Sequence, residues 1–267
     1  MTEKQIISSL QNLKVKQVVA LQQKSSERRT TGLFTVEGCR ELAHCIEAGF
    51  EIEAVFCCEE IMAGNSLSFL SGVSASCQSY EVTPAVYAKL AYRGGTEGVL
   101  AVVRSRHIQL GQLEMKANPL IVVLERVEKP GNLGAVLRSA DAAGADAVVI
   151  CDPLTDLYNP NLIRSSIGAV FTVPVVCCSS DECIAWLKER NIKILTAQLQ
   201  DSHFYYDTDM CGATALVMGT ESTGLTELWR RAADAHIRIP MLGRLDSLNV
   251  SVSTAILLFE AVRQRRK

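Results

Sequence analysis

The stretch VVLERVEKPGNLGAVLRSADAAGADAVVICD, residues 122–152, constrains the fold more than any other part of this sequence. An apolar run enters a loop with two glycines, a helix of small residues leaves that loop, and a second apolar run follows. The same alternation continues to the C-terminus. Near-continuous apolar strands separated by helices are typical of a parallel sheet that is covered by helices on both faces. We therefore predict an α/β domain over residues 119–267.

The elements of this domain follow the hydrophobic periodicity. Strands are predicted at residues 120–127, 146–152, 170–176, 192–198, 213–219 and 235–240. Further helices are predicted at residues 161–168, 180–191, 224–233 and 249–267. In the terminal helix the spacing places one apolar stripe on one side, formed by Val252, Ala255, Ile256, Phe259 and Val262. The same spacing places Ser253, Glu260 and Gln264 on the other side.

A smaller α/β domain is predicted ahead of this one. It begins with an amphipathic helix that carries Val15, Val18 and Val19 on one face. Strands are expected at residues 33–38, 51–58, 73–82 and 98–104, with helices at residues 39–49 and 84–90. Residues 106–118 break the periodicity and indicate a linker. The predicted division is thus a first domain over residues 1–105, the linker, and a second domain over residues 119–267.

The ten cysteines contain no Cys-x-x-Cys pair, and this spacing gives no reason to expect a bound metal. So many cysteines without a disulfide framework favour a reducing compartment. The polar N-terminus lacks the apolar centre of a signal peptide, and no apolar run approaches the roughly 18 residues of a membrane span. We therefore expect a cytoplasmic protein that is not embedded in a membrane.

The net charge of −2 argues against indiscriminate coating of nucleic acid, but it permits a local basic patch. Basic residues dominate the first forty positions. The candidates for contact with RNA phosphates are Lys24, Arg28, Arg29 and Arg40. From charge alone, a solvated helix face is an equally good interpretation.

The loop that opens the second domain does not match a dinucleotide site. Such a site has the pattern G-x-G-x-x-G, whereas this loop is GNLGAVLR, and the chain has no G-x-x-x-x-G-K-[ST] phosphate loop. A nicotinamide-dependent oxidoreductase is therefore the weaker alternative. Asn132 is expected to cap the helix, with Arg138 two turns beyond it. From this segment alone, a simple helix cap and an ordinary surface arginine remain open.

Two further segments repeat the arrangement of strand, polar loop and helix. LVMGTESTGL, residues 216–225, places Glu221 between two glycines, and IPMLGRLDSLNVSVS, residues 239–253, enters the last helix at Asn249 and Ser251. All three loops follow the C-terminal ends of predicted parallel strands, where open α/β sheets bind ligands. Three such loops in succession indicate a ligand site.

Together, NLGAVLRSADAAGADAVV, LVMGTESTGL and IPMLGRLDSLNVSVSTAILLFEA resemble the three motifs of the SpoU/TrmH RNA ribose methyltransferases of the SPOUT superfamily. The resemblance spans about residues 119–265. It extends more weakly to residues 24–49, which are similar to the ribosomal-protein-like substrate-binding domain of many members. It implies a C-terminal deep trefoil knot, an exception to the rule that protein chains are unknotted.

The resemblance also implies S-adenosylmethionine as cofactor, a homodimer, and methylation of a ribose 2′-hydroxyl in structured RNA. Ribosomal RNA is the expected substrate; transfer RNA, or a non-catalytic RNA-binding homologue, is the alternative. The residues implied in catalysis are Asn132, Arg138, Glu221, Asn249 and Ser251. Those implied at the cofactor are Leu216, Met218, Gly219, Ile239, Met241 and Leu248. For Arg138 we favour electrostatic stabilisation over proton abstraction, because arginine stays protonated.

Overall fold

The computed structural model describes residues 5–62, 72–74, 76–92, 97–220 and 223–266. The chain forms two compact units. The first consists of Met1–Arg106 and Asp156–Thr172, and the second of His107–Thr155 and Val173–Lys267. Residues 156–172 are thus part of the first unit, although in sequence they lie within the second predicted domain. The predicted domain boundaries stay a prediction.

The second unit is built on a seven-stranded sheet. Its strands are β6 (Leu120–Glu125), β7 (Ala147–Cys151), β8 (Val175–Cys178), β9 (Lys193–Ala197), β10 (His203–Phe204), β11 (Thr214–Met218) and β12 (Ala235–Arg238). They lie in the order β10-β12-β9-β11-β6-β7-β8. Every neighbouring pair is parallel. This confirms the predicted parallel sheet.

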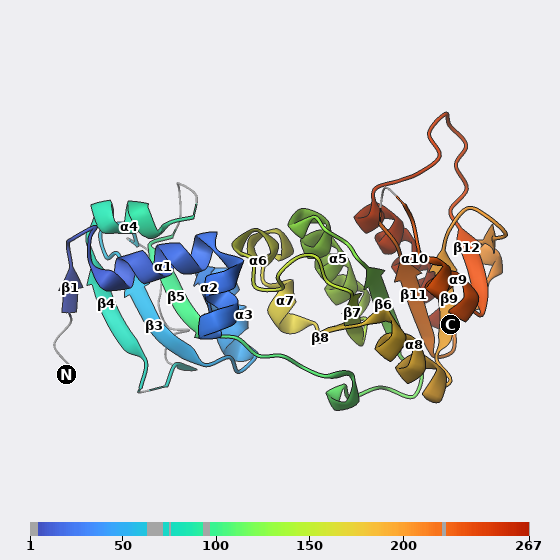
Figure 1. Cartoon of the computed structure of the whole chain (residues 1–267), viewed down its shortest axis with the longest axis horizontal. Coiled ribbons are helices and arrows are strands. Elements are labelled where there is room, and N and C mark those ends of the chain that lie inside the picture. The colour runs from blue at the N-terminus through green and yellow to red at the C-terminus, as the bar shows by residue number, and fades with distance from the viewer. Residues whose placement is uncertain (1–4, 63–71, 75, 93–96, 221–222, 267) are drawn as a thin grey trace. The chain divides into compact units, whose positions relative to one another are not determined.

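Helices cover both faces of this sheet (Figure 1). They are α5 (Pro130–Ala143), α8 (Ser180–Glu189), α9 (Glu227–Ala232) and α10 (Val250–Arg265), with short 3₁₀ turns at Leu110–Gln112 and Tyr205–Asp207. α5 and α10 pack side by side, and α8 packs against α9 over a core of alternate strand residues. Among the described residues, no helix is long and apolar enough to cross a membrane.

The first unit is a mixed five-stranded sheet with helices. Its strands are β1 (Gln5–Ile7), β2 (Leu33–Glu37), β3 (Ile52–Cys57), β4 (Gln78–Val82) and β5 (Val99–Arg104), in the order β1-β4-β3-β5-β2. Its helices are α1 (Leu13–Gln23), α2 (Ser25–Thr31), α3 (Cys39–Glu47), α4 (Pro84–Leu90), α6 (Pro160–Ser166) and α7 (Ala169–Thr172). The sequence patterns indicated most of these elements but neither β1 nor α2.

An aromatic cluster holds residues 156–172 in the first unit. The ring of Phe34 stacks on Tyr158 with centroids 4.2 Å apart. Phe50 meets Phe171 edge to face at 5.2 Å. Such aromatic pairs add to the stability that burial of their area provides. Local sequence patterns could not reveal this placement, because the partners are far apart in the chain.

Two predicted elements differ from the structure. α5 begins at Pro130 with Lys129 in the N-cap position, so the expected cap at Asn132 is wrong and Asn132 lies within the first turn. Proline suits the first turn because its missing N–H would have no partner there. The strand expected at residues 170–176 is also wrong in its first half, because α7 occupies Ala169–Thr172 and β8 begins only at Val175.

The apolar stripe predicted for α10 faces outward, and a different side of this helix faces the protein interior. The residues of this helix that face the protein interior are Val250, Thr254, Leu257, Leu258, Glu260 and Ala261. In the predicted stripe, Val252 is 47% exposed and Phe259 is 49% exposed. α10 has a second apolar face, Val250, Leu257, Leu258 and Ala261, and that face packs inward. Glu260, which was expected on the side away from the stripe, is buried, and its carboxylate accepts hydrogen bonds from Arg263 and Gln264.

Candidate functional site

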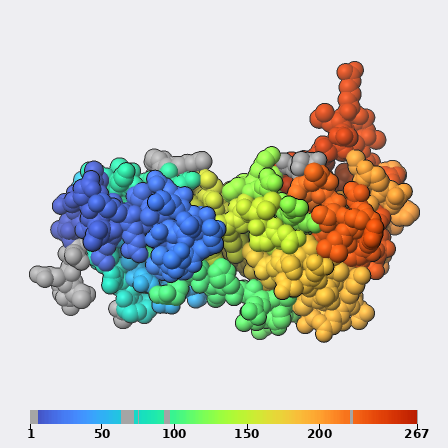
Figure 2. Space-filling view, in the orientation of Figure 1, coloured from blue at the N-terminus to red at the C-terminus, as the bar shows by residue number. Residues whose placement is uncertain are grey.

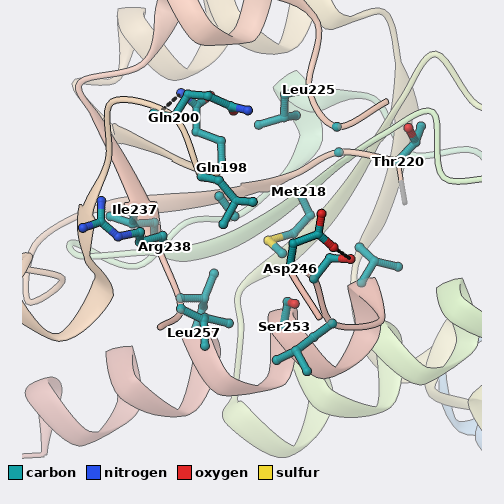
Figure 3. A pocket seen from close by; sticks show the side chains of 18 of the residues that line it. Gln198, Gln200, Met218, Thr220, Leu225, Ile237, Arg238, Asp246, Ser253 and Leu257 are labelled. Atoms are coloured by element: carbon teal, nitrogen blue, oxygen red, sulfur yellow. Dashed lines mark hydrogen bonds between the residues drawn. The ribbon is translucent and has the colours of Figure 1, made fainter. Parts of the chain in front are cut away.

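A pocket of about 350 Å³ lies at the carboxyl ends of β9, β11 and β12 (Figure 3). Met218 projects from the end of β11, and Ser253 and Leu257 project toward it from α10. The loop between β12 and α10 forms a further wall, and this loop also projects from the surface of its unit (Figure 2). The volume falls in the range of roughly 300–1,000 Å³ that is typical of small-molecule sites.

Gly219 lies where the chain makes a close approach to itself. A Cβ atom at this position would lie 2.3 Å from the carbonyl carbon of Gly224, so no other residue fits without movement of the backbone. Thr220 and Gly224 exchange two backbone hydrogen bonds of 3.2 and 3.1 Å, which close the loop. Gly224 has a φ of 68°, in the left-handed region that favours glycine. The local backbone geometry therefore explains why glycine occupies both positions.

Five of the six predicted cofactor residues line this pocket. They are Met218, Gly219, Ile239, Met241 and Leu248. Leu216 does not line the pocket, because it is fully buried within β11. The structure thus brings together two loops that are separated in the sequence, as the three-motif pattern suggested.

Two polar atoms of the pocket have no hydrogen-bond partner within the described part of the chain. They are Oε1 of Gln198 and Nε of Arg230, and both atoms are buried. A buried polar atom without a partner is costly, so it indicates a ligand or water that is needed to satisfy it. Sequence reasoning missed both residues, because neither lies in a glycine loop.

A buried carboxylate fixes the exit of the glycine loop. Glu125, at the end of β6, is 2% exposed. It accepts hydrogen bonds from the backbone N of Thr226 at 2.8 Å and from the hydroxyl of Thr226 at 2.6 Å. Thr226 is the N-cap residue of α9, so Glu125 holds the start of this helix. No local sequence pattern indicates this contact, because the two residues are 101 positions apart.

Three of the predicted catalytic residues lie together at the starts of α5 and α10. Asn249 caps α10, and its side-chain oxygen accepts hydrogen bonds from the backbone N of Ser251 at 3.0 Å and from the Ser251 hydroxyl at 2.6 Å. Its side-chain nitrogen donates to Oδ1 of Asn132 at 3.1 Å. Asn249 therefore joins the two helix starts.

Arg138 is exposed on α5, about two turns beyond Asn132. No ion pair of its guanidinium is found among the described residues. Glu221, the predicted partner of Arg138, lies outside the described residues. An exposed, charged group in the middle of α5 can contact an anionic substrate.

The four basic residues predicted to contact RNA do not share one environment. Lys24 and Arg29 are exposed. Arg40 has a half-exposed side chain that pairs with Glu41 at 2.9 Å. Arg28 is 5% exposed, pairs with Asp156 at 2.5 Å, and donates to the backbone carbonyls of residues 21 and 22. In this conformation Arg28 holds the structure together and is not available to a phosphate.

A second cavity, of about 260 Å³, lies in the first unit beside Arg40. Its charged lining includes Arg164 from α6 together with Glu37, Glu41 and Glu97. The mixture of signs leaves this cavity without the strongly positive surface that a phosphate backbone requires.

Two family models match the chain. The model described as SpoU rRNA Methylase family matches residues 119–259. The model described as MRM3-like substrate binding domain matches residues 12–101. The first covers the pocket and the cluster of helix starts, and the second covers most of the first unit.

Individual relatives carry related names. The chain is 41% identical over 157 residues to the 23S rRNA (guanosine-2′-O-)-methyltransferase RlmB of Pectobacterium atrosepticum, and the match covers 58% of this chain and 63% of that protein. It is 29% identical over 262 residues to a 23S rRNA (uridine(2479)-2′-O)-methyltransferase of Streptomyces viridochromogenes, covering 95% of this chain and 91% of that protein. The first match thus spans less than two thirds of its relative.

The fold is also similar to that of a solved structure. The AdoMet-bound rRNA methyltransferase from Sinorhizobium meliloti superposes with a TM-score of 0.90 at 28% sequence identity. The superposition covers 98% of this chain and 99% of that one. The similarity therefore includes both units.

Proposed function

Because this chain belongs to the SpoU rRNA methylase family, we propose that it is an S-adenosylmethionine-dependent methyltransferase that acts on a ribose 2′-hydroxyl in RNA. The observation that carries this proposal is the pocket between the loops that follow β11 and β12. It lies at the carboxyl edge of the parallel sheet, where α/β folds bind their ligands. Ribosomal RNA is the proposed substrate, because both relatives described above are named for 23S rRNA.

The residues of the pocket fit this cofactor. Apolar side chains such as Met218 and Leu257 suit a flat base, and the buried polar atoms of Gln198 and Arg230 need partners that an amino-acid or adenine group provides. Gly219 lines the pocket and packs directly against the backbone of Gly224, where a side chain would not fit. S-adenosylmethionine supplies, when bound, an electrophilic methyl group on a sulfonium. The remaining task of the chain is to align the acceptor ribose and stabilise the loss of its proton.

Arg138 is the residue that we place at the reacting centre. Its guanidinium stays protonated in proteins, so it is a poor base and a good partner for a phosphate or a developing alkoxide. Its exposure on α5 leaves it accessible to RNA. Glu221, outside the described residues, is proposed to orient it.

Asn132, Asn249 and Ser251 are proposed to position the ribose. The hydrogen bond between the two asparagines fixes the start of α5 relative to the start of α10. The Ser251 hydroxyl donates a hydrogen bond to Asn249, so the three side chains form one polar group at the helix starts, and we assign contact with the ribose to this group. A 2′-hydroxyl can both donate and accept such bonds, and DNA lacks it.

The quaternary arrangement and the knot belong to the same proposal. The outward stripe of α10 consists of apolar residues spaced three and four apart, Val252, Ala255, Ile256 and Phe259, and we propose that a second copy of this chain covers it. A deep trefoil knot is proposed for the segments around residues 219–224 and 242–249. Neither feature follows from the strand order alone.

The first unit is proposed to bind the RNA. The match to a substrate-binding domain supports this role, and Lys24, Arg29 and Arg40 are the exposed cations that we assign to phosphate contacts. Arg28 is left out, because it is buried. A cytoplasmic location is proposed from the cysteine content, which favours a reducing compartment.

Transfer of labelled methyl from S-adenosylmethionine to ribosomal RNA tests the proposal. Incorporation that resists alkaline hydrolysis at one nucleotide is expected, because a methylated 2′-oxygen cannot attack the adjacent phosphate. Mapping of ribose methylation in cells without the gene, and after its restoration, identifies the nucleotide. Binding of RNA and cofactor without any transfer would instead indicate a non-catalytic homologue.

A further inference from the structure

Three cysteines from three different elements meet in the second unit. They are Cys151 at the end of β7, Cys178 at the end of β8, and Cys183 in the first turns of α8. All three sulfur atoms lie within 4.8 Å of one another. None of these residues lines the pocket assigned to the methyl donor.

The sheet register and the helix α8 produce this cluster. Cys151 and Cys178 are directly paired in the parallel strands β7 and β8, so their side chains project from the same face of the sheet. α8 starts directly after β8 and packs on that face, which brings Cys183 over the strand ends. Cys177 precedes Cys178 in the strand, and its side chain is on the opposite face and exposed.

The cluster is dry on one side and open on the other. Cys151 and Cys183 are fully buried within the core under α8, whereas Cys178 is partly exposed. If the three thiols only packed as small apolar groups, their sulfur atoms would not have to lie close together, and none of them would have to be exposed. The exposure of Cys178 provides a path by which an ion can enter.

The spacing suits three sulfur ligands around one ion. Zinc–sulfur bonds are about 2.3 Å long, so three sulfurs in a plane around one ion lie about 4 Å apart. The sulfurs are already within 4.8 Å, and small side-chain rotations close the difference. Soft thiolate ligands select Cu(I) and Zn(II) over the hard cations.

The surroundings of Cys178 suit a thiolate ligand and a bound cation. The first turn of α8 lies immediately after Cys178, and the positive end of a helix dipole stabilises a thiolate. The carboxylates of Asp152 and Glu182 are close enough to act on Cys178, and their negative charge favours a bound cation.

We propose that Cys151, Cys178 and Cys183 form a binding site for one thiophilic metal ion, Zn(II) or Cu(I), separate from the methyl-transfer site. Binding forms three metal–sulfur bonds and releases the three thiol protons to solvent, with no change of oxidation state. The ion links β7, β8 and α8 and so stabilises this end of the sheet. Zn(II) would take a water as its fourth ligand on the exposed side of Cys178.

Metal titration of the full chain tests this inference. The protein is freed of metal with a chelator, kept reduced, and titrated separately with Zn(II) and with Cu(I) against a chromophoric competitor. We expect one equivalent of at least one ion to be retained and the melting temperature to rise with it. X-ray absorption of the loaded protein should show three sulfur ligands, with an added oxygen for Zn(II).

Single substitutions separate the cluster from other thiols. Cys178→Ser should lose the bound equivalent and its melting shift, whereas Cys177→Ser, one residue away on the other face, should keep both. Melting curves of the metal-free variants check folding, and Cys151→Ser is the second variant if Cys178→Ser does not melt cooperatively. Retention of neither ion by the parent chain, a Cys178→Ser variant that binds like the parent, or equal loss in Cys177→Ser would each overturn the inference.

Discussion

At the scale of single residues, the guanidinium of Arg138 lies exposed on α5 and carries the proposed chemistry. Arg138→Lys keeps the charge and the helix propensity, but lysine lacks the planar fork that grips two oxygens. We expect the variant to bind S-adenosylmethionine like the parent, to keep its melting temperature, and to lose about 10²-fold or more of its methyl-transfer rate. Single-turnover assays with labelled cofactor measure this rate.

Arg231→Lys is the matched control for this experiment. Arg231 is an exposed helix residue of the second unit that pairs with Glu227 on its own helix. Its replacement should leave the transfer rate unchanged. Near-parental turnover in Arg138→Lys would remove the residue from the mechanism while leaving the cofactor pocket intact.

Replacement by alanine should have different effects at the adjacent residues Arg28 and Arg29: the first should lower stability, and the second should weaken RNA binding. Arg28→Ala leaves the carboxylate of Asp156 without its buried partner and should lower the free energy of unfolding by about 3 kcal/mol or more. Arg29→Ala removes an exposed cation and should change stability by less than about 0.5 kcal/mol. It should instead reduce the slope of the logarithm of the RNA-binding constant against the logarithm of the salt concentration by about 1, the change expected for one lost phosphate contact.

Chemical melts and RNA titrations at several salt concentrations measure the two effects. If Arg28→Ala proves as stable as the parent and weakens RNA binding, the buried ion pair is not formed in solution. An unchanged salt slope in Arg29→Ala would exclude this residue from the RNA interface.

The predicted cofactor residues include those of the loops after β11 and β12, but not the pocket residues Gln198 and Arg230. Gly219, Met241 and Leu248 belong to loops that the family resemblance singled out, and all three line the pocket. Gln198 and Arg230 join the pocket only through the packing of β9 and α9, which no local pattern records. The burial of Arg28 likewise depends on Asp156, 128 residues away in the chain.

At the scale of elements, the helix α10 shows what periodicity can and cannot decide. The spacing of its apolar residues correctly indicated a helix and one stripe, but the helix carries apolar residues on a second face as well. Which face becomes core depends on the neighbours α5 and β11, which contact the face of Leu257 and Leu258. The thiol cluster likewise depends on tertiary packing, because its three cysteines come from three different elements.

The N-cap of α10 can be separated from its link to α5 by two substitutions. Asn249→Ala removes both the cap and the bond to Asn132 and should cost about 1 kcal/mol of stability. Asn249→Asp keeps an acceptor for the Ser251 N–H but cannot donate to Oδ1 of Asn132. We expect Asn249→Asp to melt like the parent and still to lose methyl transfer, because the two helix starts no longer share a hydrogen bond.

Thermal melts and transfer assays on the same preparations test this separation. Ser179→Ala, which removes the N-cap of α8, is the control for the loss of a cap and should keep methyl transfer, because Ser179 does not line the pocket. Full activity in Asn249→Asp would show that the bond between the asparagines has no part in positioning the ribose.

At the scale of the whole molecule, each compact unit is formed by two separate segments of the chain. Residues 156–172 follow β7 of the second unit and yet pack into the first, through the ring of Tyr158 on Phe34 and the ion pair of Asp156 with Arg28. Removal of residues 1–105 would therefore expose Tyr158 and Phe171. A truncated chain is for this reason a poor test of the RNA-binding role of the first unit, and point substitutions such as Arg29→Ala are better.

The proposed dimer gives the last prediction. Phe259 belongs to the outward stripe of α10 and is 49% exposed, and a charge there would be buried without a partner in a paired interface. Phe259→Glu should convert a dimer into a monomer in sedimentation at micromolar concentration while leaving the melting curve of the monomer cooperative. Leu228→Glu, at a residue of α9 that is 40% exposed, is the control and should leave the mass unchanged. A parent chain that sediments as a monomer, or a Phe259→Glu variant that stays dimeric, would show that this face of α10 does not bind a second copy.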